Sequence, residues 1–402
     1  MRTIAWPMEP PEIFSVLRAI QFKHLKWDIF HRGDVSILPE ALVLTEAEHA
    51  YLVDTAEGVW AALREVEAKV CGNLDLLEAV AIPEPLRQAT MDQLPDHPRV
   101  TRCDFHLTEQ GQWVISEFND DVPSGFGECT GLADVLTNQW SDRFEGLSFR
   151  GDLRGAVVDA LSPWKSVGLI HATGYSEDLQ HVALVGKWLE EAGHTTVLGS
   201  PANLRVEDDQ VYVFDDPVDA IFRYYPGEWL ADLPNTEDWV QSAPFLPAMN
   251  PLSSLASQSK RFYATWHEHD LDLTQEHRAL LDEFLPGSRY LSSLSLDEVL
   301  ANPNRWVLKG AFGRMGNTVR IGPLMPKEKW EAAVHEAYGT APIIAAQRRF
   351  ETAPLWTARG VGFATVGVYL VNGRFAGYFS RIDKGPLIDY DSWHVPTLVE
   401  IS

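Results

Sequence analysis

The sequence is poor in cysteine, in basic residues and in long apolar runs. Its three cysteines, Cys71, Cys103 and Cys129, are an odd number without CxxC spacing, which argues against a disulfide framework and a zinc site and favours buried, inert thiols. No segment approaches the roughly 18 consecutive apolar residues of a membrane span, and the N-terminus lacks the pattern of a signal peptide. We therefore expect a cytoplasmic protein without a membrane partner.

Positive charge is scarce as well, because 33 Lys and Arg stand against 57 Asp and Glu, for a formal net charge of -24. This charge would repel a phosphate backbone over most of the surface, so we expect no nucleic-acid partner. A cationic substrate such as a polyamine would be attracted, although acidity also serves solubility alone. The sequence indicates no particular oligomeric state.

At 402 residues the chain is too long for one ordinary core, and we expect about two to three domain-sized parts of an α/β protein with α+β lobes. An N-terminal helical region and a hairpin fill residues 1–160. An open α/β unit, expected to bind substrate, fills residues 161–255, and a second α+β lobe fills residues 256–402. The absence of GxGxxG after the first strand of the middle unit and of GxxxxGK[ST] in the last lobe argues against dinucleotide-binding and P-loop folds.

Apolar periodicity predicts the main elements of these parts. A long helix is clearest over residues 45–70, and a C-terminal hairpin turns at Asn372 and Gly373, which favour type I′ geometry. In the middle unit we expect strands at 166–170, 195–198, 210–214 and 220–224 and a helix at 179–192. In the last lobe we expect two helices around 260–285, a strand that ends at 309 and a helix at 327–338.

The most informative stretch is VTRCDFHLTEQGQWVISEFNDD, which begins at residue 100. Residues alternate in character on either side of Gln110 and Gly111, which predicts a hairpin with Arg102, Asp104 and His106 on one face. A polar face of this kind on a hairpin is a candidate site.

With a two-residue turn at 110–111, Asp104 faces Glu117 and Arg102 faces Asn119. Like charges directly opposite on a sheet are destabilising, and a divalent cation held by hard oxygen ligands relieves the repulsion. The carboxylates of Asp104 and Glu117 and the amide oxygen of Asn119 are therefore candidate Mg²⁺ ligands. A solvent-facing hairpin, or an ion pair between Arg102 and Glu117, would explain the same pattern.

Two further segments contain candidate binding residues. Ser124, in the loop after the hairpin, would either donate to a substrate carboxylate or cap the helix that begins near Gly127. Lys309 ends a strand and is followed by a glycine-rich segment, residues 310–316. A strand-end lysine presents a point charge to phosphate oxygens, and glycines let backbone amides approach them, whereas an ordinary glycine turn is the alternative.

These residues carry a resemblance to a known family. Arg-x-Asp, followed after the hairpin by Glu-Phe-Asn-Asp-Asp-x-Pro-Ser, resembles the R-x-D and E-Y-N-A-D-T-P-T-S signature of glutathionylspermidine synthase and its stand-alone relatives. Segments resembling other family motifs follow in the same order within about residues 100–397. They are VDAIFRYYPGEWL from residue 218, SK from 259, VLKGAFGRMG from 307 and VGVYLVNGRFAGYFSRID from 366.

The resemblance implies a permuted ATP-grasp fold, similar to that of glutathione synthetase, in which the metal-binding hairpin precedes the nucleotide lysines. It implies an ATP-dependent ligase that forms a C–N bond between a small-molecule or peptide carboxylate and an amine through an acyl phosphate, with ATP and Mg²⁺. We expect no amidase domain, because none of the three cysteines has a matching histidine context.

Carried over position by position, the resemblance assigns roles on the hairpin side of the site. It implies that Asp104, Glu117 and Asn119 coordinate Mg²⁺. Arg102 and Ser124 would hold the carboxylate of the acyl donor.

The remaining roles lie in the C-terminal lobe. The resemblance implies that Lys260 and Lys309 contact nucleotide phosphates and that Gln347 lies where adenine binds. Arg381 would stabilise the transferring phosphoryl group. The loop that covers the phosphates would include Gly313, Arg314 and Gly316.

The chain departs from the family motifs at Asp120, Gly125, Phe126, Gly310 and Met315. The first three lie beside the predicted acyl-donor site and argue against glutathione itself as the donor. Two other functions remain open, namely a nucleotide-binding protein without ligase activity, and a scaffold whose 14 Trp and its Tyr form a partner surface.

Overall fold

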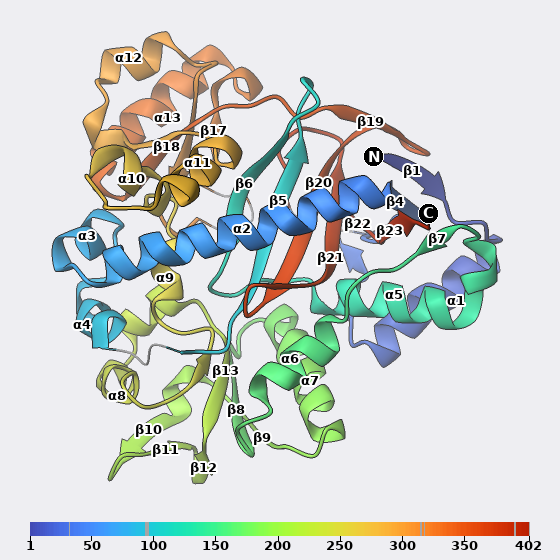
Figure 1. Cartoon of the computed structure of the whole chain (residues 1–402), viewed down its shortest axis with the longest axis horizontal. Coiled ribbons are helices and arrows are strands. Elements are labelled where there is room, and N and C mark those ends of the chain that lie inside the picture. Colours follow the sequence, from blue (N-terminus) through green and yellow to red (C-terminus); the bar gives the residue numbers. More distant parts are fainter. Residues whose placement is uncertain (32, 93–95, 314–315, 317, 390, 402) are drawn as a thin grey trace.

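The computed structural model describes residues 1–402 except 32, 93–95, 314, 315, 317, 390 and 402. Its centre is a sheet with the strand order β22-β21-β20-β5-β6, to which β19 adds at β20 (Figure 1). The sheet pairs the predicted hairpin directly with the C-terminal strands. Its strands are β5 Val100–Leu107, β6 Trp113–Asn119, β19 Pro354–Thr357, β20 Gly360–Val371, β21 Arg374–Asp383 and β22 Trp393–Val395.

A second sheet, of order β15-β18-β16-β17, lies at the upper left of Figure 1 with α12 and α13 beside it. The predicted strand that ends at Lys309 and the predicted helix near 327–338 are both present. The elements of this lobe are α10 Thr265–Glu268, α11 Gln275–Phe284, β15 Ser288–Tyr290, α12 Leu296–Ala301, β16 Trp306–Gly310, β17 Arg320–Ile321, α13 Lys327–Gly339 and β18 Ile344–Arg348.

A parallel sheet, β14-β13-β8-β9, lies below the central sheet in Figure 1, with α6 and α7 against it and the small sheet β10-β11-β12 at its edge. The five expected α/β elements are found here within a few residues, as β8 Ser166–His171, α7 Ser176–Glu191, β9 Thr195–Gly199, β11 Gln210–Val213 and β13 Ala220–Tyr224. The elements that the sequence did not predict are α6 Leu153–Leu161, β10 Leu204–Glu207, β12 Asp216–Val218, α8 Thr236–Ser242, β14 Ala248–Met249 and α9 Ser254–Gln258.

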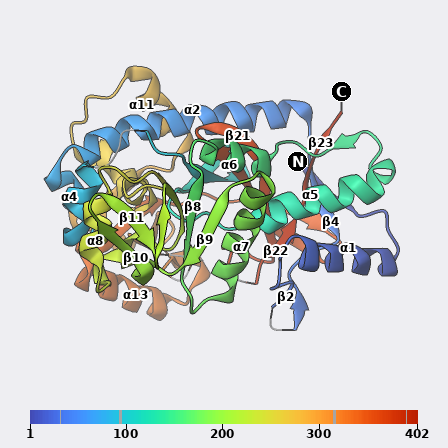
Figure 2. The same ribbon diagram turned by 90° about the horizontal axis from the view of Figure 1, so that it is seen from below.

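The two chain ends meet in a further sheet, β1-β4-β23-β7, packed beside α1 and α5. Figure 2 shows these elements on one side of the molecule, with α2 and α13 on opposite faces of the rest. The elements are β1 Arg2–Ala5, α1 Pro10–Lys23, β2 Phe30–His31, β3 Asp34–Val35, β4 Glu40–Leu44, α5 Phe126–Trp140, β7 Leu147–Ser148 and β23 Thr397–Glu400.

The long helix α2, Glu46–Cys71, crosses the central sheet and confirms the helix predicted at 45–70. Thr45 caps it, accepting from the Glu48 N–H while Glu48 reaches back, a capping box that satisfies two backbone donors. Among the described residues, no helix is both long and apolar enough to cross a membrane. The remaining short helices are α3 Leu74–Ala79, α4 Glu84–Asp92, η1 Ser141–Arg143, η2 Pro201–Asn203, η3 Gly227–Asp232, η4 Phe262–Ala264, η5 Leu291–Ser293, η6 Gly322–Leu324 and η7 Ala341–Ile343.

The hairpin register is the predicted one, but the predicted turn is wrong. Asp104 pairs with Glu117 and Arg102 with Asn119. The connection is longer than two residues, because the Thr108 N–H donates to the Gln112 carbonyl at 2.8 Å. A register shift after Asp104 puts Phe105 opposite Ile115 and leaves Ser116 as the extra residue, so the bulge cancels the longer turn. The C-terminal turn is as predicted, with φ of 49° at Asn372 and 75° at Gly373.

The segment that follows the hairpin is anchored by two buried aspartates with different partners. The Asp120 carboxylate is 2.6 Å from Arg64 on α2, and the Asp121 carboxylate is 2.6 Å from Arg223 on β13. Both backbone N–H groups donate to Gln258, at 2.9 and 3.1 Å. The chain beyond Asn119 is therefore held between the long helix and the parallel sheet.

We predict that Asp121→Ala lowers the free energy of unfolding by about 3–5 kcal/mol, because it leaves the buried Arg223 guanidinium without its carboxylate. Asp215→Ala is the matched control, since Asp215 is fully exposed and lies 3.8 Å from Arg205; it should cost under about 0.5 kcal/mol. Denaturant unfolding at neutral pH measures both. Equal stability of the two variants would contradict the anchoring role.

Candidate functional site

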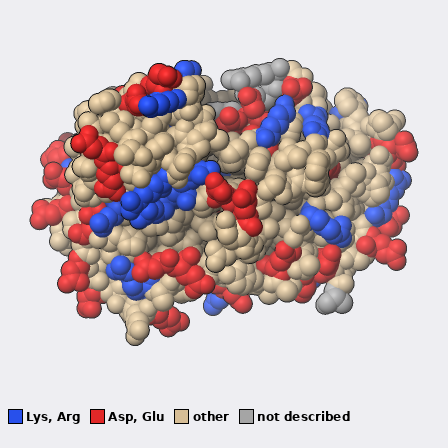
Figure 3. Space-filling view, turned by 90° about the horizontal axis from the view of Figure 1, so that it is seen from above, with Lys and Arg blue, Asp and Glu red and all other residues tan. Residues whose placement is uncertain are grey.

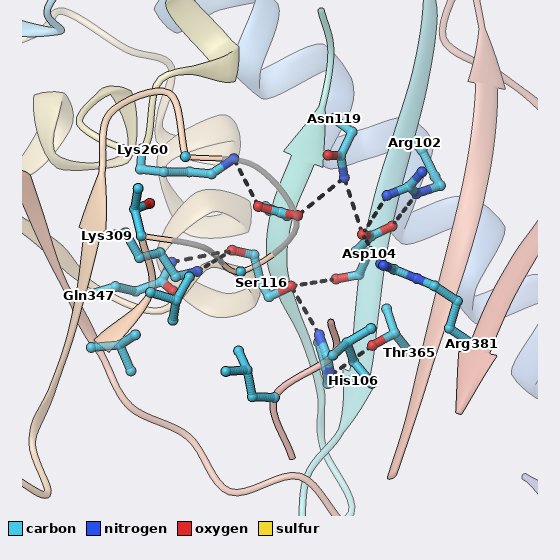
Figure 4. Close-up of a pocket in the computed structure, with 18 of the residues that line it drawn as sticks. Arg102, Asp104, His106, Ser116, Asn119, Lys260, Lys309, Gln347, Thr365 and Arg381 are labelled. Carbon is cyan, nitrogen blue, oxygen red and sulfur yellow. Dashed lines mark hydrogen bonds and ion pairs between the residues drawn. The ribbon is translucent and has the colours of Figure 1, made fainter. Parts of the chain in front are cut away.

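A cavity of about 650 Å³ lies between the hairpin, the sheet of the C-terminal lobe and the start of α7. Figure 4 shows side chains from all sides pointing into it. The predicted residues that line it are Arg102, Asp104, Glu117, Asn119, Ser124, Lys260, Lys309, Gly313, Gly316, Gln347 and Arg381. Arg314 lies outside the described residues. The structure thus brings the other predicted residues together around one cavity.

Asp104 is the most heavily contacted acid of the site and is 1% exposed. Arg102 donates to both of its oxygens, from Nε at 2.7 Å and from Nη2 at 3.0 Å. Arg381 Nη2 and Asn119 Nδ2 each donate to Oδ2 at 3.1 Å. Because Asp104 is buried and paired with Arg102, both the solvent-facing hairpin and the pairing of Arg102 with Glu117 are wrong.

Glu117 faces the C-terminal lobe and forms an ion pair with Lys260, whose Nζ lies 2.8 Å from Oε2. Asn119 Nδ2 also donates to Glu117, at 3.4 Å, so its amide joins both carboxylates. Burial alone would raise the pKa of the Glu117 carboxyl, but the charges of Lys260 and Lys309 outweigh it and hold that pKa well below its usual range. Glu117 is therefore an anion at neutral pH.

Lys309 and Gln347 meet the hairpin at a single backbone oxygen. Lys309 Nζ and Gln347 Nε2 lie 3.3 and 3.5 Å from the Ser116 carbonyl, which belongs to the bulged residue. Burial lowers the pKa of Lys309 to about 8, with Lys260 adding to the effect and Glu117 opposing it. Lys309 is thus a cation that titrates near physiological pH.

Arg381 extends from β21 toward Asp104 (Figure 4). Its side chain is 13% exposed. Burial lowers the pKa of its guanidinium, although Asp104 opposes this. Its Nε is buried and has no hydrogen-bond partner within the described part of the chain. A buried, unsatisfied donor in a cavity is suited to an anionic ligand.

The Ser124 loop is fixed by its backbone. Its carbonyl accepts from Arg102 Nη1 at 2.6 Å and from the Tyr369 hydroxyl at 2.5 Å. The helix after it, α5, has Gly125 as its N-cap and no side-chain cap, so the capping role for Ser124 is wrong. Gly125 has a φ of 108°, and a Cβ there would overlap Phe379, which excludes the family's larger residue at this position.

The glycine-rich segment is packed so closely against Thr318 that a side chain would not fit at Gly313. A Cβ at Gly313 would overlap the Thr318 hydroxyl, and that hydroxyl accepts from the Gly310 N–H at 3.3 Å. Gly316 has a φ of 71°, in the left-handed region that favours glycine. Lys260, expected to start a helix, instead lies between α9 and η4, where its N–H donates to the Ala311 carbonyl at 2.8 Å. This bond joins the two segments of the site.

His106, Ser116 and Thr365 are among the residues of the cavity wall that were given no role from the sequence. His106, recognised only as part of the polar face, lies with Nε2 3.0 Å from Ser116 Oγ and Nδ1 3.4 Å from Thr365 Oγ1. Burial lowers the pKa of His106 to about 4, so the ring is neutral at physiological pH. The His106 ring therefore supports the bulge through its contact with Ser116. The alternation in the sequence could have indicated His106, but nothing in it marks the bulge at Ser116.

The residues present suit a magnesium ion, although the described residues contain no group of three or more His, Cys, Asp or Glu able to hold a metal. The predicted set has two carboxylates and one amide, which is the hard-oxygen donor set that Mg²⁺ shares with phosphates and water. Asn119 Nδ2 donates to both acids, so the three groups lie together. Arg102, Arg381, Lys260 and Lys309 also gather around these two carboxylates, and such a group of cations suits the phosphates of a nucleotide.

The sheets and the site define a permuted ATP-grasp fold of the glutathione-synthetase type, in which the acidic hairpin precedes the lysines. The family model of the glutathionylspermidine synthase preATP-grasp region matches residues 19–400. The chain therefore belongs to the glutathionylspermidine synthase family, a ligase-type family.

Two solved structures match this chain at low sequence identity. A glutathione synthetase-like effector, GSS30, from Globodera pallida has a TM-score of 0.63 and 12% identity, covering 98% of this chain and 99% of that one. A putative gamma-glutamylcysteine synthetase from Methylobacillus flagellatus has a TM-score of 0.45 and 12% identity, covering 80% and 86%. No curated protein matches.

We predict that nucleotide affinity falls as the pH rises above the Lys309 pKa of about 8, because the deprotonated amine no longer attracts phosphate. The dissociation constant for ATP should rise about tenfold between pH 7 and pH 9 if only protonated Lys309 binds. Titration calorimetry across this range measures it. Lys309→Arg should abolish the pH dependence, and a flat profile in the parent protein would contradict the assignment.

Proposed function

We propose that this protein is an ATP-dependent ligase that joins a carboxylate to an amine through an acyl phosphate. The observation that carries the proposal is the convergence of Lys260, Arg102 and Arg381 on two facing carboxylates in one cavity, with Lys309 in the same wall. Cations gathered in a water-poor site stabilise the charge of a transferring phosphoryl group. Membership of a ligase-type family supports the same conclusion.

The nucleotide would lie between the C-terminal lobe and the hairpin. Lys260 and Lys309 would contact its phosphates, Gln347 its adenine, and the loop with Gly313 and Gly316 would cover it. Magnesium, held by the carboxylates of Asp104 and Glu117 and the amide oxygen of Asn119, would supply charge neutralisation at the phosphate oxygens. Lys309 would then exchange the Ser116 carbonyl for a phosphate oxygen.

In the first step an oxygen of the donor carboxylate attacks the γ-phosphorus, and the bond from that phosphorus to the bridging oxygen of ADP breaks. Arg102 and Ser124 would align the carboxylate, and Arg381 would stabilise the equatorial oxygens. The unsatisfied Nε of Arg381 supports this role.

In the second step an uncharged amine attacks the carbonyl carbon of the acyl phosphate. The carbon–oxygen bond to phosphate breaks, phosphate leaves, and the amine nitrogen loses a proton as the amide forms. The covering loop would keep water from hydrolysing the intermediate. The donor would be an amino-acid or peptide carboxylate and the acceptor an amine such as a polyamine.

The scaffold alternative loses support, because nine of the fourteen tryptophans are buried and serve the cores instead of a partner surface. A nucleotide-binding protein without ligase activity remains the competing function. The described structure favours the ligase, since both carboxylates and Arg381 are kept inside the cavity at the cost of desolvation.

Mass spectrometry of reactions with ATP, Mg²⁺, pooled amino acids, short peptides and polyamines tests the proposal. We expect a product equal to acid plus amine minus water, with a matching amount of ADP. Asp104→Ala and Glu117→Ala should abolish ATP turnover. Nucleotide binding without any condensed product would instead support the competing function, and normal turnover by either variant would reject the magnesium assignment.

We predict that Arg381→Ala lowers kcat by about 10²–10³-fold with little change in thermal stability, because it removes charge from the phosphoryl-transfer site. Arg374→Ala is the matched control, since Arg374 starts the same strand and its side chain is 83% exposed. Steady-state ADP release measures both variants. Normal turnover by Arg381→Ala would remove Arg381 from the catalytic residues.

A further inference from the structure

Basic and acidic side chains are mixed on the face of the molecule shown in Figure 3, so surface charge alone is a weak basis for selecting a substrate. Buried polar groups are more selective, because a buried donor or acceptor without a partner costs free energy. One such group is the peptide unit that joins Ser124 to Gly125, beside the predicted acyl-donor site. Its carbonyl and its N–H are bound by different parts of the chain.

The carbonyl of this peptide unit is bound by the central sheet. It accepts from Arg102 Nη1 on β5 at 2.6 Å and from the Tyr369 hydroxyl on β20 at 2.5 Å. Arg102 is also the residue that we expect to align the donor carboxylate. The orientation of the Ser124 carbonyl therefore helps to decide where the Arg102 guanidinium lies.

The N–H of the same peptide unit is bound by α7, where it donates to His181 Nε2 at 3.0 Å. His181 Nδ1 lies 2.8 Å from the Glu177 carbonyl, one turn earlier on the helix. A backbone N–H can only donate and a carbonyl can only accept, so the ring must be neutral with its proton on Nδ1. His181 is 3% exposed and stacks on Tyr224, with the ring centres 4.7 Å apart.

The charged groups packed around His181 are consistent with a neutral ring. Burial lowers the pKa of the His181 imidazole and Lys26 adds to this effect, although Glu128 and Asp28 oppose it. Lys26 Nζ holds both acids, at 2.6 Å from Glu128 and 2.8 Å from Asp28. A second proton on the ring would place one N–H against another at Gly125, so only the neutral ring holds the peptide unit.

The glycine at position 125 makes the bond to His181 important. Gly125 has a φ of 108°, and turning the peptide unit over would bring that angle to a negative value, which glycine adopts about as readily. A residue with a side chain would overlap Phe379 here. The backbone alone therefore permits two orientations of the Ser124 carbonyl, and the hydrogen bonds at its two ends select one of them.

We propose that His181 is a positioning residue, which fixes the peptide unit after Ser124, and with it Arg102, in the orientation that receives the donor carboxylate. This inference rests on the proposed function. His181 acts through the Gly125 N–H and not by touching substrate, because its ring is buried. Glu177, whose carbonyl the same ring holds, is part of the cavity wall, so one ring joins two walls of the site.

Donor-dependent ADP release tests this role, with His181→Asn and His181→Gln as a matched pair. Both variants carry an amide and lose the stacking on Tyr224, but only the longer Gln places its oxygen where Nε2 accepts from Gly125. The probe is an equimolar mixture of amino acids and short peptides, varied in total concentration at constant polyamine and Mg²⁺-ATP. We expect the half-saturating donor concentration to rise about tenfold in His181→Asn and less than about twofold in His181→Gln.

The half-saturating concentration of ATP should stay within about twofold of the parent value in both variants, because the peptide unit lies at the donor end of the cavity. His194→Asn is the control, since His194 follows α7 and its Nδ1 also contacts a carbonyl, that of Trp164 at 2.8 Å; it should behave as the parent. Normal donor kinetics in His181→Asn, an equal rise in the Asn and Gln variants, or a parallel rise for ATP would each overturn the positioning role.

Nuclear magnetic resonance of protein with isotope-labelled histidine measures the ring independently of activity, and it decides the question if His181→Asn does not fold. At neutral pH the signals that disappear in His181→Gln should report a neutral ring with its proton on Nδ1. A proton on Nε2, or a charged ring, would overturn the bond to Gly125 and with it the positioning role.

The positioning role and the proposed function fail in different ways. If the parent releases ADP and forms product but the His181 variants or the ring proton contradict the expectation, His181 is rejected while the ligase proposal stands. If the parent releases no ADP with any donor mixture, both are rejected, because His181 then has no donor to position.

Discussion

The mutual repulsion of two carboxylates, Asp104 and Glu117, facing each other across one hairpin is the constraint on which the site depends. Each carboxylate is paired with cations from a different part of the chain, which offset this repulsion. Arg102 and Arg381 hold Asp104 from the central sheet, while Lys260 holds Glu117 from the segment before the C-terminal lobe. The hairpin is therefore the place where distant segments must meet. The cations gathered there are those that a polyphosphate would contact.

The fold keeps this hairpin in place with contacts that take no part in chemistry. Asp120 and Asp121 tie the chain after Asn119 to α2 and to β13. His106 and Ser116 hold the bulge whose carbonyl accepts from the lysine of the opposite lobe. Burying charged groups in this way is costly unless they are paired, so the pairs serve geometry more than stability.

Alternation and turn residues predicted the hairpin pairing, because a period of two and a glycine turn are local properties. The bulge at Ser116 could not be predicted from the sequence, because it depends on contacts with His106 and the opposite lobe. The predicted register was correct only because the bulge cancels the effect of a longer turn. The ion pair between Arg381 and Asp104 joins strands far apart in sequence and was not predicted; the resemblance only assigned both residues to one site. No local feature of the sequence indicated that Asp120, which stands where the family has alanine, would be buried. The division into three parts stays a prediction, as do the compartment and the individual residue roles.

Binding of a non-hydrolysable ATP analogue with and without Mg²⁺, measured by calorimetry, tests the central claim most directly. In the parent protein Mg²⁺ should tighten binding by about tenfold or more, because the ion joins both carboxylates to the phosphates. In Asp104→Asn and Glu117→Gln, with thermal stability confirmed, that enhancement should be lost. An unchanged enhancement in both variants, or none in the parent, would contradict a site built around these two acids.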